Sequence, residues 1–337
     1  MGKLSFFHKI VYTINAIFAL FLLLACIVPY IPSASFSFLS LAVPLLVILN
    51  AIFVVYWGMV RFKLLWFSVI ALVIGYFSLG SFVEFSRSRE ENKIEKDVKV
   101  MSFNVRGFNK RNDIARPTVF EEIKHLIDNE KPDVICFQEI SFQKIKEFVD
   151  YPYRFLEHRK GKSSQGILSK FPMVKKGFLD FPETSNGGGY ADIVVENDTI
   201  RIYNLHLESL RIRPGMIKRE KSDRLFKRLR YSFSKQQEQV AFFRENADSC
   251  PYGKIVCGDF NNTQFSYAYR TIKGDMSDTF SEKGNGYGKT IKFWCFPLRI
   301  DFILANPNME VLSHKNYNLR LSDHEPVMAS LKLGSNK

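Results

Sequence analysis

The chain has 337 residues and a formal net charge of +13, and its length favours two domains. The charge is unevenly distributed: the first 85 residues hold four basic residues and one acidic residue, a net of +3, which leaves +10 for the remainder. That remainder has ordinary globular composition and is long enough to bury a full core. No Cys-x-x-Cys pair occurs, which excludes a zinc ribbon or a thioredoxin-type redox site.

Three apolar runs, at about residues 10–30, 36–57 and 64–83, dominate the first 85 residues, and none contains an internal charge. A helix needs about 20 apolar residues to cross the hydrocarbon core of a bilayer. The alternative is a buried soluble core, or a cleaved signal peptide followed by a core, but three such runs in so short a stretch argue against it. We therefore predict an integral membrane region over residues 1–85, with three transmembrane α-helices.

Basic residues predict the orientation of these helices. Lys3 and Lys9 precede the first run, and Arg61 and Lys63 separate the second from the third. Because basic loops stay on the cytoplasmic side, the N-terminus is expected in the cytoplasm and the globular part on the extracytoplasmic face. The mixed-charge stretch 86–96 is predicted to be a linker, and residues 97–335 are predicted to form the globular domain.

Short apolar runs rich in β-branched residues predict strands in the globular domain. They lie at 98–105, 133–138, 165–169, 191–196, 199–208, 254–257, 299–304 and 326–333. Helical spacing of apolar residues predicts a helix over 117–129. The glycine-rich stretches 186–190 and 284–288 are expected to be loops. Strands alternating with fewer helices favour a layered α/β domain.

The segment Arg211–Lys235 is strongly basic, with ten Lys or Arg residues against two acidic ones, and has partial helical spacing. One hypothesis is a surface that contacts anionic lipid headgroups or nucleic acid. The other is an ordinary solvated helix face, and the sequence leaves both open. It also leaves open a disulfide between Cys250 and Cys295, which an oxidising compartment would permit.

Polar side chains follow many of the predicted strands. A single Asp after a strand is usually a turn residue, but a whole set at strand ends suggests a site. Hydrolysis of a phosphate ester needs a hard cation, a carboxylate that orients or deprotonates water, and donors that hold the phosphoryl oxygens. The candidates for these roles are Asn104, Glu139, His206, Asp259, Asn261, Asp301, Asp323 and His324.

The order of these residues resembles that of the endonuclease/exonuclease/phosphatase superfamily. The matching segments are MSFNVRG (101–107), DVICFQEI (133–140), NLHLES (204–209), GDFNNT (258–263), RIDFIL (299–304) and SDHEPV (322–327). Each segment alone is weak evidence, whereas the ordered set is specific. The resemblance implies a four-layer α/β/β/α sandwich with one divalent-metal site, taking Mg²⁺ or alternatively Mn²⁺.

The same resemblance implies roles for the acidic and amide residues. Glu139 is expected to be the main metal ligand, with Asn104 beside it and Asp323 facing the metal directly or through water. Asp259 is expected to orient or activate the attacking water. Asn261 is expected to bind the phosphoryl oxygen and to position Asp259.

For the histidines, the resemblance implies that His324 stabilises charge on the phosphate and that Asp301 fixes its tautomer. His206 is expected to act as general acid or phosphate ligand. Two departures from the pattern stand out: Arg106 occupies a position that is acidic in some members, and no Glu partner for His206 can be placed, since the stretch 161–165 contains none.

These expectations combine into a membrane-anchored phosphoesterase whose substrate is a nucleic acid or a phospholipid headgroup, with no obligate protein partner. The alternative is a catalytically silent binding module, tethered to the membrane, that kept the scaffold. The retention of the whole set argues against that alternative; its members are Asn104, Glu139, Asp259, Asn261, Asp323 and His324.

Overall fold

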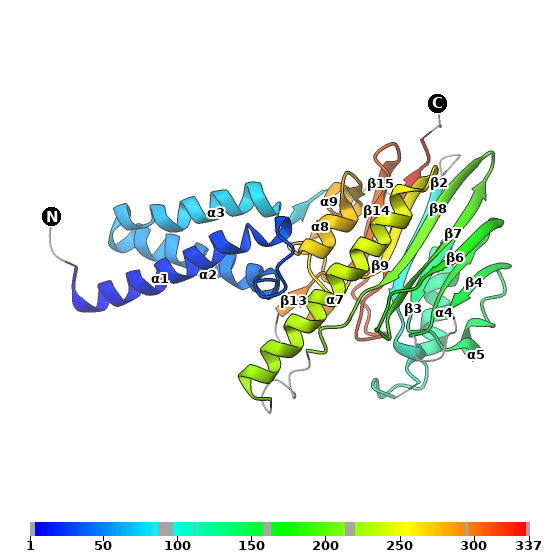
Figure 1. Cartoon of the computed structure of the whole chain (residues 1–337), viewed down its shortest axis with the longest axis horizontal. Coiled ribbons are helices and arrows are strands. Elements are labelled where there is room, and N and C mark those ends of the chain that lie inside the picture. Colours follow the sequence, from blue (N-terminus) through cyan, green and yellow to red (C-terminus); the bar gives the residue numbers. More distant parts are fainter. Residues whose placement is uncertain are drawn as a thin grey trace. The chain divides into compact units, whose positions relative to one another are not determined.

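The computed structural model describes residues 4–81, 83–86, 97–110, 112–157, 163–212, 220–293 and 296–334 (Figure 1). Its contacts divide the chain into two compact units. We call them the helical unit, which comprises the residues up to Phe82 together with Asn262–Thr271, and the sandwich unit, which comprises Val83–Asn261 and Ile272–Lys337. Apart from Ser86, the predicted linker 86–96 lies outside the described residues.

The helical unit is built on α1 (Phe6–Ala25), α2 (Leu39–Val60) and α3 (Trp66–Leu79). With their flanking turns they give three stretches long and apolar enough to cross a membrane: Phe6–Tyr30, Leu39–Val60 and Phe62–Leu79. The three apolar runs are therefore helices, as predicted.

Buried polar side chains connect these three helices. Asn15 of α1 donates from Nδ2 to Ser68 Oγ of α3 at 2.6 Å, and its Oδ1 accepts from Trp57 Nε1 of α2 at 2.9 Å. All three side chains have no exposed surface. Hydrogen bonds between apolar helices fix their packing, because buried polar groups have no water as an alternative hydrogen-bond partner. Asn15 therefore ties the helical unit together.

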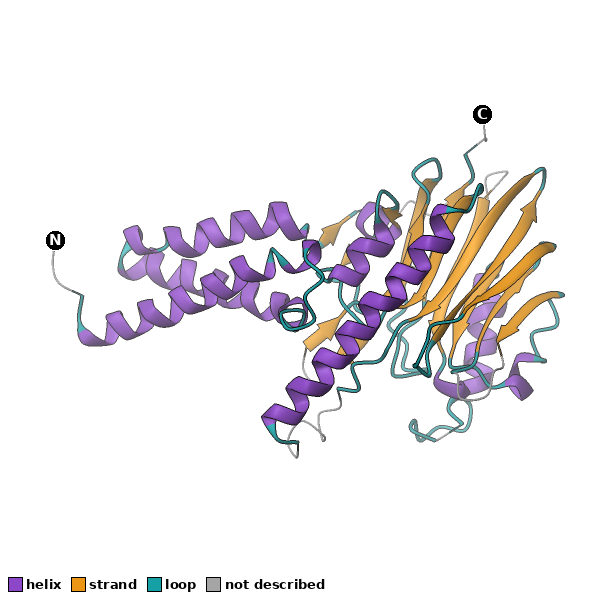
Figure 2. Ribbon diagram, viewed as in Figure 1, coloured by secondary structure: helices purple, strands orange, loops and turns teal. Residues whose placement is uncertain are grey.

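The sandwich unit contains two six-stranded sheets (Figure 2). In spatial order, the first sheet contains β15 (Glu310–Asn316), β16 (Val327–Lys332), β2 (Asp97–Asn104), β3 (Val134–Gln138), β5 (Gln165–Ser169) and β4 (Tyr153–Glu157). The second contains β10 (Ser277–Asp278), β14 (Asp301–Ala305), β9 (Gly253–Asp259), β8 (Asp198–His206), β7 (Gly187–Val195) and β6 (Met173–Leu179). Two short pairs, β1 (Glu84–Phe85) with β11 (Asn285–Gly286) and β12 (Ile291–Phe293) with β13 (Phe296–Leu298), stand apart from them.

The predicted four layers are present in the sandwich unit. Between the sheets lies a core of mostly β-branched side chains, including Val100, Ile202 and Ile255. On the outer face of the first sheet, the apolar side of α4 (Val119–Glu130) packs against aromatic side chains of β2 and β3. On the outer face of the second sheet, α7 (Ser222–Asp248) places Phe243 5.1 Å from the ring of Tyr203, between centroids. The short helices are α5 (Phe142–Ile145), α8 (Tyr267–Lys273) and α9 (Thr279–Lys283).

Each sheet contains one parallel pair at its centre. In the first sheet β2 and β3 run parallel, with Asn104 opposite Gln138. In the second sheet β8 and β9 run parallel, with His206 opposite Asp259. Because parallel strands end at the same edge of a sheet, each pair presents its last side chains together. Asn104, His206 and Asp259 are the last residues of their strands, and Glu139 directly follows β3.

The glycine-rich stretch 186–190 is not a loop, so that expectation was wrong. Gly187–Gly189 lie in β7 and are buried. A Cβ added to Gly189 would lie 2.3 Å from Phe155 Cε1, so the absence of a side chain makes room for a ring of the facing sheet. In the other stretch, Asn285–Gly286 forms the short strand β11.

Gly258, in β9, should be intolerant of any side chain. Its φ is +143°, and a Cβ there would lie 1.9 Å from the carbonyl oxygen of Leu205 in the neighbouring strand. Because backbone atoms of a central parallel pair cannot move aside, Gly258→Ala should cost about 4 kcal/mol or more. Thermal unfolding followed by circular dichroism measures this loss. The control is Gly253→Ala in the same strand, which meets only the tip of Met309; equal melting temperatures for the two variants would refute the expectation.

Candidate active site

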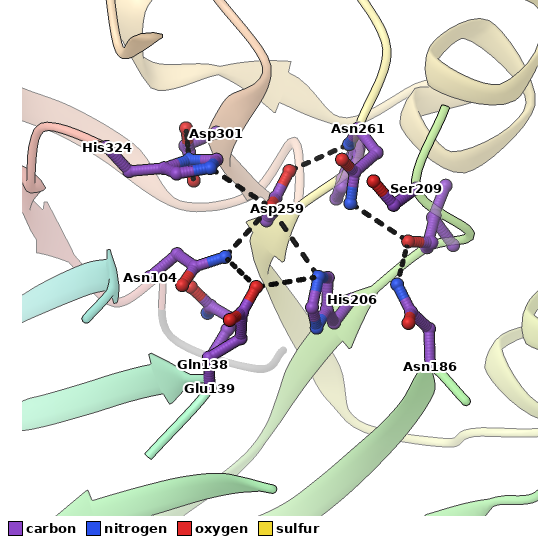
Figure 3. A network of polar contacts seen from close by, with 12 residues as sticks. Asn104, Gln138, Glu139, Asn186, His206, Ser209, Asp259, Asn261, Asp301 and His324 are labelled. Atoms are coloured by element: carbon purple, nitrogen blue, oxygen red, sulfur yellow. Dashed lines mark hydrogen bonds and ion pairs between the residues drawn. The ribbon is translucent and has the colours of Figure 1, made fainter. Parts of the chain in front are cut away.

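Asp259, the last residue of β9, lies at the centre of the candidate site (Figure 3). Only 1% of its surface is exposed. Its Oδ2 accepts from Asn104 Nδ2 at 3.1 Å and lies 3.6 Å from Nε2 of both His206 and His324. Burial raises the pKa of Asp259, while the two histidines act to lower it. One carboxylate oxygen is thus shared by an amide and two imidazoles.

Asp301 and His324 form a buried pair beside Asp259. The antiparallel pairing of β14 with β9 places Asp301 opposite Asp259. His324 Nδ1 lies 2.9 Å from Asp301 Oδ2, so Nδ1 carries a proton and donates it while Nε2 faces Asp259. Burial acts to lower the pKa of His324, but the Asp301 and Asp259 carboxylates outweigh it and hold the pKa well above its usual value. The two carboxylates therefore favour the protonated form of His324.

Glu139 follows β3 in a left-handed backbone conformation, with φ of 53°. This conformation is uncommon for residues other than glycine and costs of order 1 kcal/mol. Its Oε1 accepts from Asn104 Nδ2 at 3.3 Å and lies 4.0 Å from His206 Nε2, while 40% of the side chain is exposed. Glu139 therefore presents a carboxylate to solvent at the mouth of the buried cluster.

Asn261 closes a turn over Asp259. Its backbone N–H donates to Asp259 Oδ1 at 2.8 Å, and its Nδ2 donates to the carbonyl of Leu207 at 3.0 Å. Its φ is 49°, which is again left-handed. From α7, Gln236 Nε2 donates to the carbonyls of Glu208 at 2.8 Å and Phe260 at 3.4 Å. The turn that carries Asp259 is thus held from two sides.

His206 has a free ring nitrogen. Its Nδ1 is buried and has no hydrogen-bond partner among the residues that the structure describes. Gly187 pairs with His206 across β7 and β8, and a Cβ on Gly187 would lie 3.1 Å from a carboxylate oxygen of Glu157. Glu157 is fully buried, and Gln165 donates to it. The carboxylate of Glu157, which was not among the predicted site residues, therefore lies close to Gly187, the residue paired with His206.

Asp323 is the one candidate that the structure does not bring into the cluster. Its carboxylate contacts the guanidinium of Arg106 and accepts from Ser322 Oγ at 3.1 Å. Arg106 also pairs with Asp113 at 2.9 Å. The Asp323 charge still contributes to raising the pKa of its neighbour His324. Arg106, which occupies a position that is acidic in some family members, thus forms an ion pair with Asp323 beside the site.

Two groups of residues could hold a cation. Asp259, Asp301 and His324 offer ligand atoms that all lie within 4.8 Å of one another. However, Asp301 and Nδ1 of His324 already satisfy each other, which leaves less room for an ion. Glu139 fits a hard ion better, because its carboxylate is accessible and Mg²⁺ prefers oxygen ligands with retained waters. Asn104 turns its Nδ2 toward Glu139 while its Oδ1 accepts from the Arg106 N–H, so its amide would have to turn to become a ligand.

The sequence reading missed two residues that support the site. Gln138 Nε2 donates to Asn204 Oδ1 at 2.7 Å, and Asn204 Nδ2 donates to the carbonyls of Phe137 and Gly166 at 2.9 and 3.0 Å. These bonds join the two sheets directly beneath the strand ends. The available signal was a polar residue inside each of two apolar strand runs, where an unpaired amide would be costly.

Comparisons with known proteins identify the family and the fold. The model of the Endonuclease/Exonuclease/phosphatase family matches residues 101–324, and that of a domain of unknown function, DUF8431, matches residues 8–82. A search of curated protein sequences finds no significant match.

Three solved structures share the fold. The endonuclease/exonuclease/phosphatase from Bacteroides vulgatus is 17% identical with a TM-score of 0.56, covering 71% of this chain and 100% of its own. TDP2 from D. rerio, complexed with a single-strand DNA product, is 14% identical with a TM-score of 0.54, covering 70% and 99%. The mannosyl-6-phosphatase Bt3783 from Bacteroides thetaiotaomicron is 18% identical with a TM-score of 0.52, covering 69% and 99%. Since the family model spans most of the chain and includes every candidate residue, the protein belongs to the endonuclease/exonuclease/phosphatase family.

Proposed function

We propose that the protein is a membrane-anchored, divalent-metal-dependent phosphoesterase that hydrolyses a phosphate ester by in-line attack of water. The observation that carries this proposal is the convergence on Asp259. One buried carboxylate is surrounded by an amide and two imidazoles, with the accessible carboxylate of Glu139 alongside. This set matches the needs of phosphoryl transfer, which are charge neutralisation, water activation and positioned donors.

Glu139 and Asn104 would hold the cation, Mg²⁺ or alternatively Mn²⁺. Asp323 would join them only after leaving Arg106. A bound divalent ion supplies positive charge against the phosphoryl oxygens. The carboxylate and amide oxygens of Glu139 and Asn104 are the donor type that such ions take.

The remaining residues act on water and substrate. Asp259 orients the attacking water and accepts its proton. The Asn261 N–H bond to Oδ1 fixes the carboxylate, and Oδ2 faces the Asn104 amide and the two histidines. His324, protonated and held by Asp301, stabilises charge that develops on the phosphoryl oxygens. His206 lies 3.6 Å from the same carboxylate and serves the leaving-group side as acid or phosphate ligand.

Asp301→Asn should narrow the pH range of activity. The Asp301 carboxylate is a principal cause of the raised pKa of His324, so its loss lowers that pKa and depletes the imidazolium as pH rises. The alkaline limb of the kcat profile should move to lower pH, with kcat at pH 8 reduced about 100-fold, as for loss of a positioned acid–base group. A pH–rate series checks this, and an unmoved alkaline limb would show that Asp301 does not tune His324.

The helical unit supplies the anchor in this proposal. Residues 1–85 cross the bilayer three times with the N-terminus in the cytoplasm, and residues 97–335 work on the extracytoplasmic side. The basis is the apolar helices together with the basic residues at their ends, Lys9 and Lys63 among them. Cysteine labelling from outside intact cells, at an introduced exposed site such as Ser281→Cys, tests the orientation.

The substrate is a nucleic acid or a lipid headgroup, and the basic segment Arg211–Lys235 offers the contact surface. Part of that segment is committed elsewhere: Lys235 is buried against Glu183 and Glu238, and Arg228 pairs with Glu220. Residues 213–219 lie outside the described residues. The basic side chains left exposed along the start of α7 are Lys221, Arg224, Lys227 and Arg230.

A panel of supercoiled plasmid, sphingomyelin, a phosphoinositide and a nitrophenyl phosphodiester, each with Mg²⁺, identifies the substrate class. The fold alone does not choose between them, since one neighbour was solved with a DNA product and another is a mannosyl-6-phosphatase. Binding to plasmid should weaken steeply with salt if phosphate contacts dominate. Turnover of no member of the panel would favour the alternative, a silent binding module.

The disulfide left open between Cys250 and Cys295 plays no part in the proposal. Cys250 is a free, buried thiol, and Cys295 lies outside the described residues.

A further inference from the structure

The helical unit contains one segment from far along the chain. Asn262–Thr271 belongs to it, although the residues on either side belong to the sandwich unit. The chain enters this segment directly after Asn261, with no intervening residue, and Asn261 closes the turn over Asp259. The proposed catalytic turn is therefore continuous with a segment that packs on the apolar helices.

Pro44 of α2 creates the acceptor that receives this segment. In an α-helix the N–H of residue 44 would bond to the carbonyl of residue 40, but proline has no N–H. The hydroxyl of Thr263 donates to the Ser40 carbonyl at 2.9 Å instead. In a bilayer no water is available to hydrogen-bond a carbonyl that lacks its helical partner, so another donor is needed. The proline and the threonine, over 200 residues apart in the sequence, thus form a matched pair.

Further contacts fix the segment around that bond. Ser40 Oγ donates to Asn262 Oδ1 at 3.0 Å, and the same oxygen accepts from the Thr263 N–H at 2.9 Å. Phe265 is 2% exposed and lies in the apolar cluster shared by the helices. The Arg270 guanidinium lies over the ring of Tyr30, 3.9 Å from its centroid. Hydrogen bonds, apolar burial and a cation–π contact therefore all hold the segment on the helices.

We propose that the membrane helices are a working part of the catalytic machinery, with Thr263 as a positioning residue whose bond to Ser40 fixes the turn that carries Asp259 and Asn261. The inference rests on the proposed function. Asn261 adopts a left-handed backbone, and its bonds to Asp259, Leu207 and Gln236 hold it on the sandwich side. The bond of Thr263 to Ser40 holds the chain two residues further on. Loss of that tether should let the turn relax and misplace the carboxylate, which affects turnover more than substrate binding.

The test uses the full-length chain in nanodiscs with Mg²⁺ and a nitrophenyl phosphodiester. Thr263→Val removes the hydroxyl at nearly constant shape, and Thr263→Ser restores it. Thr263→Val should lower kcat about tenfold with KM within twofold, and Thr263→Ser should recover most of the loss. Thr199→Val, at the end of β8 remote from His206, is the matched control and should leave kcat unchanged.

Hydrogen exchange gives a readout that does not depend on turnover. Amides of Asn261, Asn262 and Thr263 should exchange faster in Thr263→Val than in Thr263→Ser, with the rest of β9 unchanged. If Thr263→Val keeps kcat within twofold of Thr263→Ser, positioning by the helices is overturned. If the wild type turns over no substrate, the proposed function has failed, and unchanged exchange at these amides would separately overturn the docking of the turn.

Discussion

Asp259→Asn should lower kcat for phosphodiester hydrolysis about 10³-fold. The substitution keeps the shape of the side chain but removes the basic carboxylate that the account assigns to water activation, a role worth about 10² to 10⁴ in rate. It also removes the negative charge that faces both histidines at 3.6 Å. Steady-state kinetics with Mg²⁺ measures the loss, and KM should change much less than kcat.

The control for this variant is Asp275→Asn, which makes the same chemical change at an exposed position. It should keep wild-type activity. Thermal unfolding of both proteins separates lost chemistry from lost folding, and removing a carboxylate whose pKa is raised by burial should not destabilise the fold. Retention of more than a tenth of wild-type kcat by Asp259→Asn would contradict the role of Asp259.

Glu139→Gln should lower activity about 10³-fold at low Mg²⁺ and weaken Mg²⁺ binding. The carboxylate is the accessible oxygen ligand of the site, and a neutral amide loses the charge that a hard cation requires. Titration of activity against Mg²⁺ should give a much higher half-saturating concentration. Mg²⁺ should raise the melting temperature of the wild type, and this rise should be smaller in Glu139→Gln.

Glu310→Gln is the matched control for the metal assignment, because Glu310 is exposed on the edge strand β15 with only a long 4.0 Å pairing to Lys332. An exposed pair of this kind contributes little to stability. If the half-saturating Mg²⁺ concentration is unchanged in Glu139→Gln, Glu139 is not the metal ligand. The Asp259, Asp301 and His324 group would then be the next candidate.

Much of the fold could be predicted from the sequence. Uncharged runs of about 20 residues gave the three helices of the helical unit, and buried β-branched runs gave the strands of both parallel pairs. The edge strands β4 and β6 were missed because they face solvent on one side and carry charged residues. The glycines of β7 were wrongly predicted to form a loop. Gly189 makes room for Phe155 of the facing sheet, and this requirement cannot be recognised from the local sequence.

Most of the candidate site was predictable as well, since polar residues at the ends of buried strands converge when those strands run parallel. Asp323 did not follow that logic: it lies in a loop, and its nearest opposite charge, Arg106, comes from a segment 217 residues away. Gln138 and Asn204 escaped notice because their task is to bond the two sheets to each other. Hydrogen bonds between distant segments produce no periodic pattern in the local sequence, so they could not be predicted from it.

The segment Asn262–Thr271 shows the same limit more sharply. Nothing in its local sequence connects it with Pro44. The fold shows that the Ser40 carbonyl, which has no N–H partner at Pro44, accepts from the Thr263 hydroxyl. The Thr263 variants test the role that we propose for the helices in turnover.

The most direct test of the phosphoesterase assignment is hydrolysis of a nitrophenyl phosphodiester by the purified full-length protein, with Mg²⁺, after chelation with EDTA, and after Mg²⁺ is restored. We expect product release that stops on chelation, returns with the ion, and is about 10³-fold slower for Asp259→Asn protein prepared in parallel. Hydrolysis that persists in EDTA, or that Asp259→Asn performs at more than a tenth of the wild-type rate, would contradict the assignment.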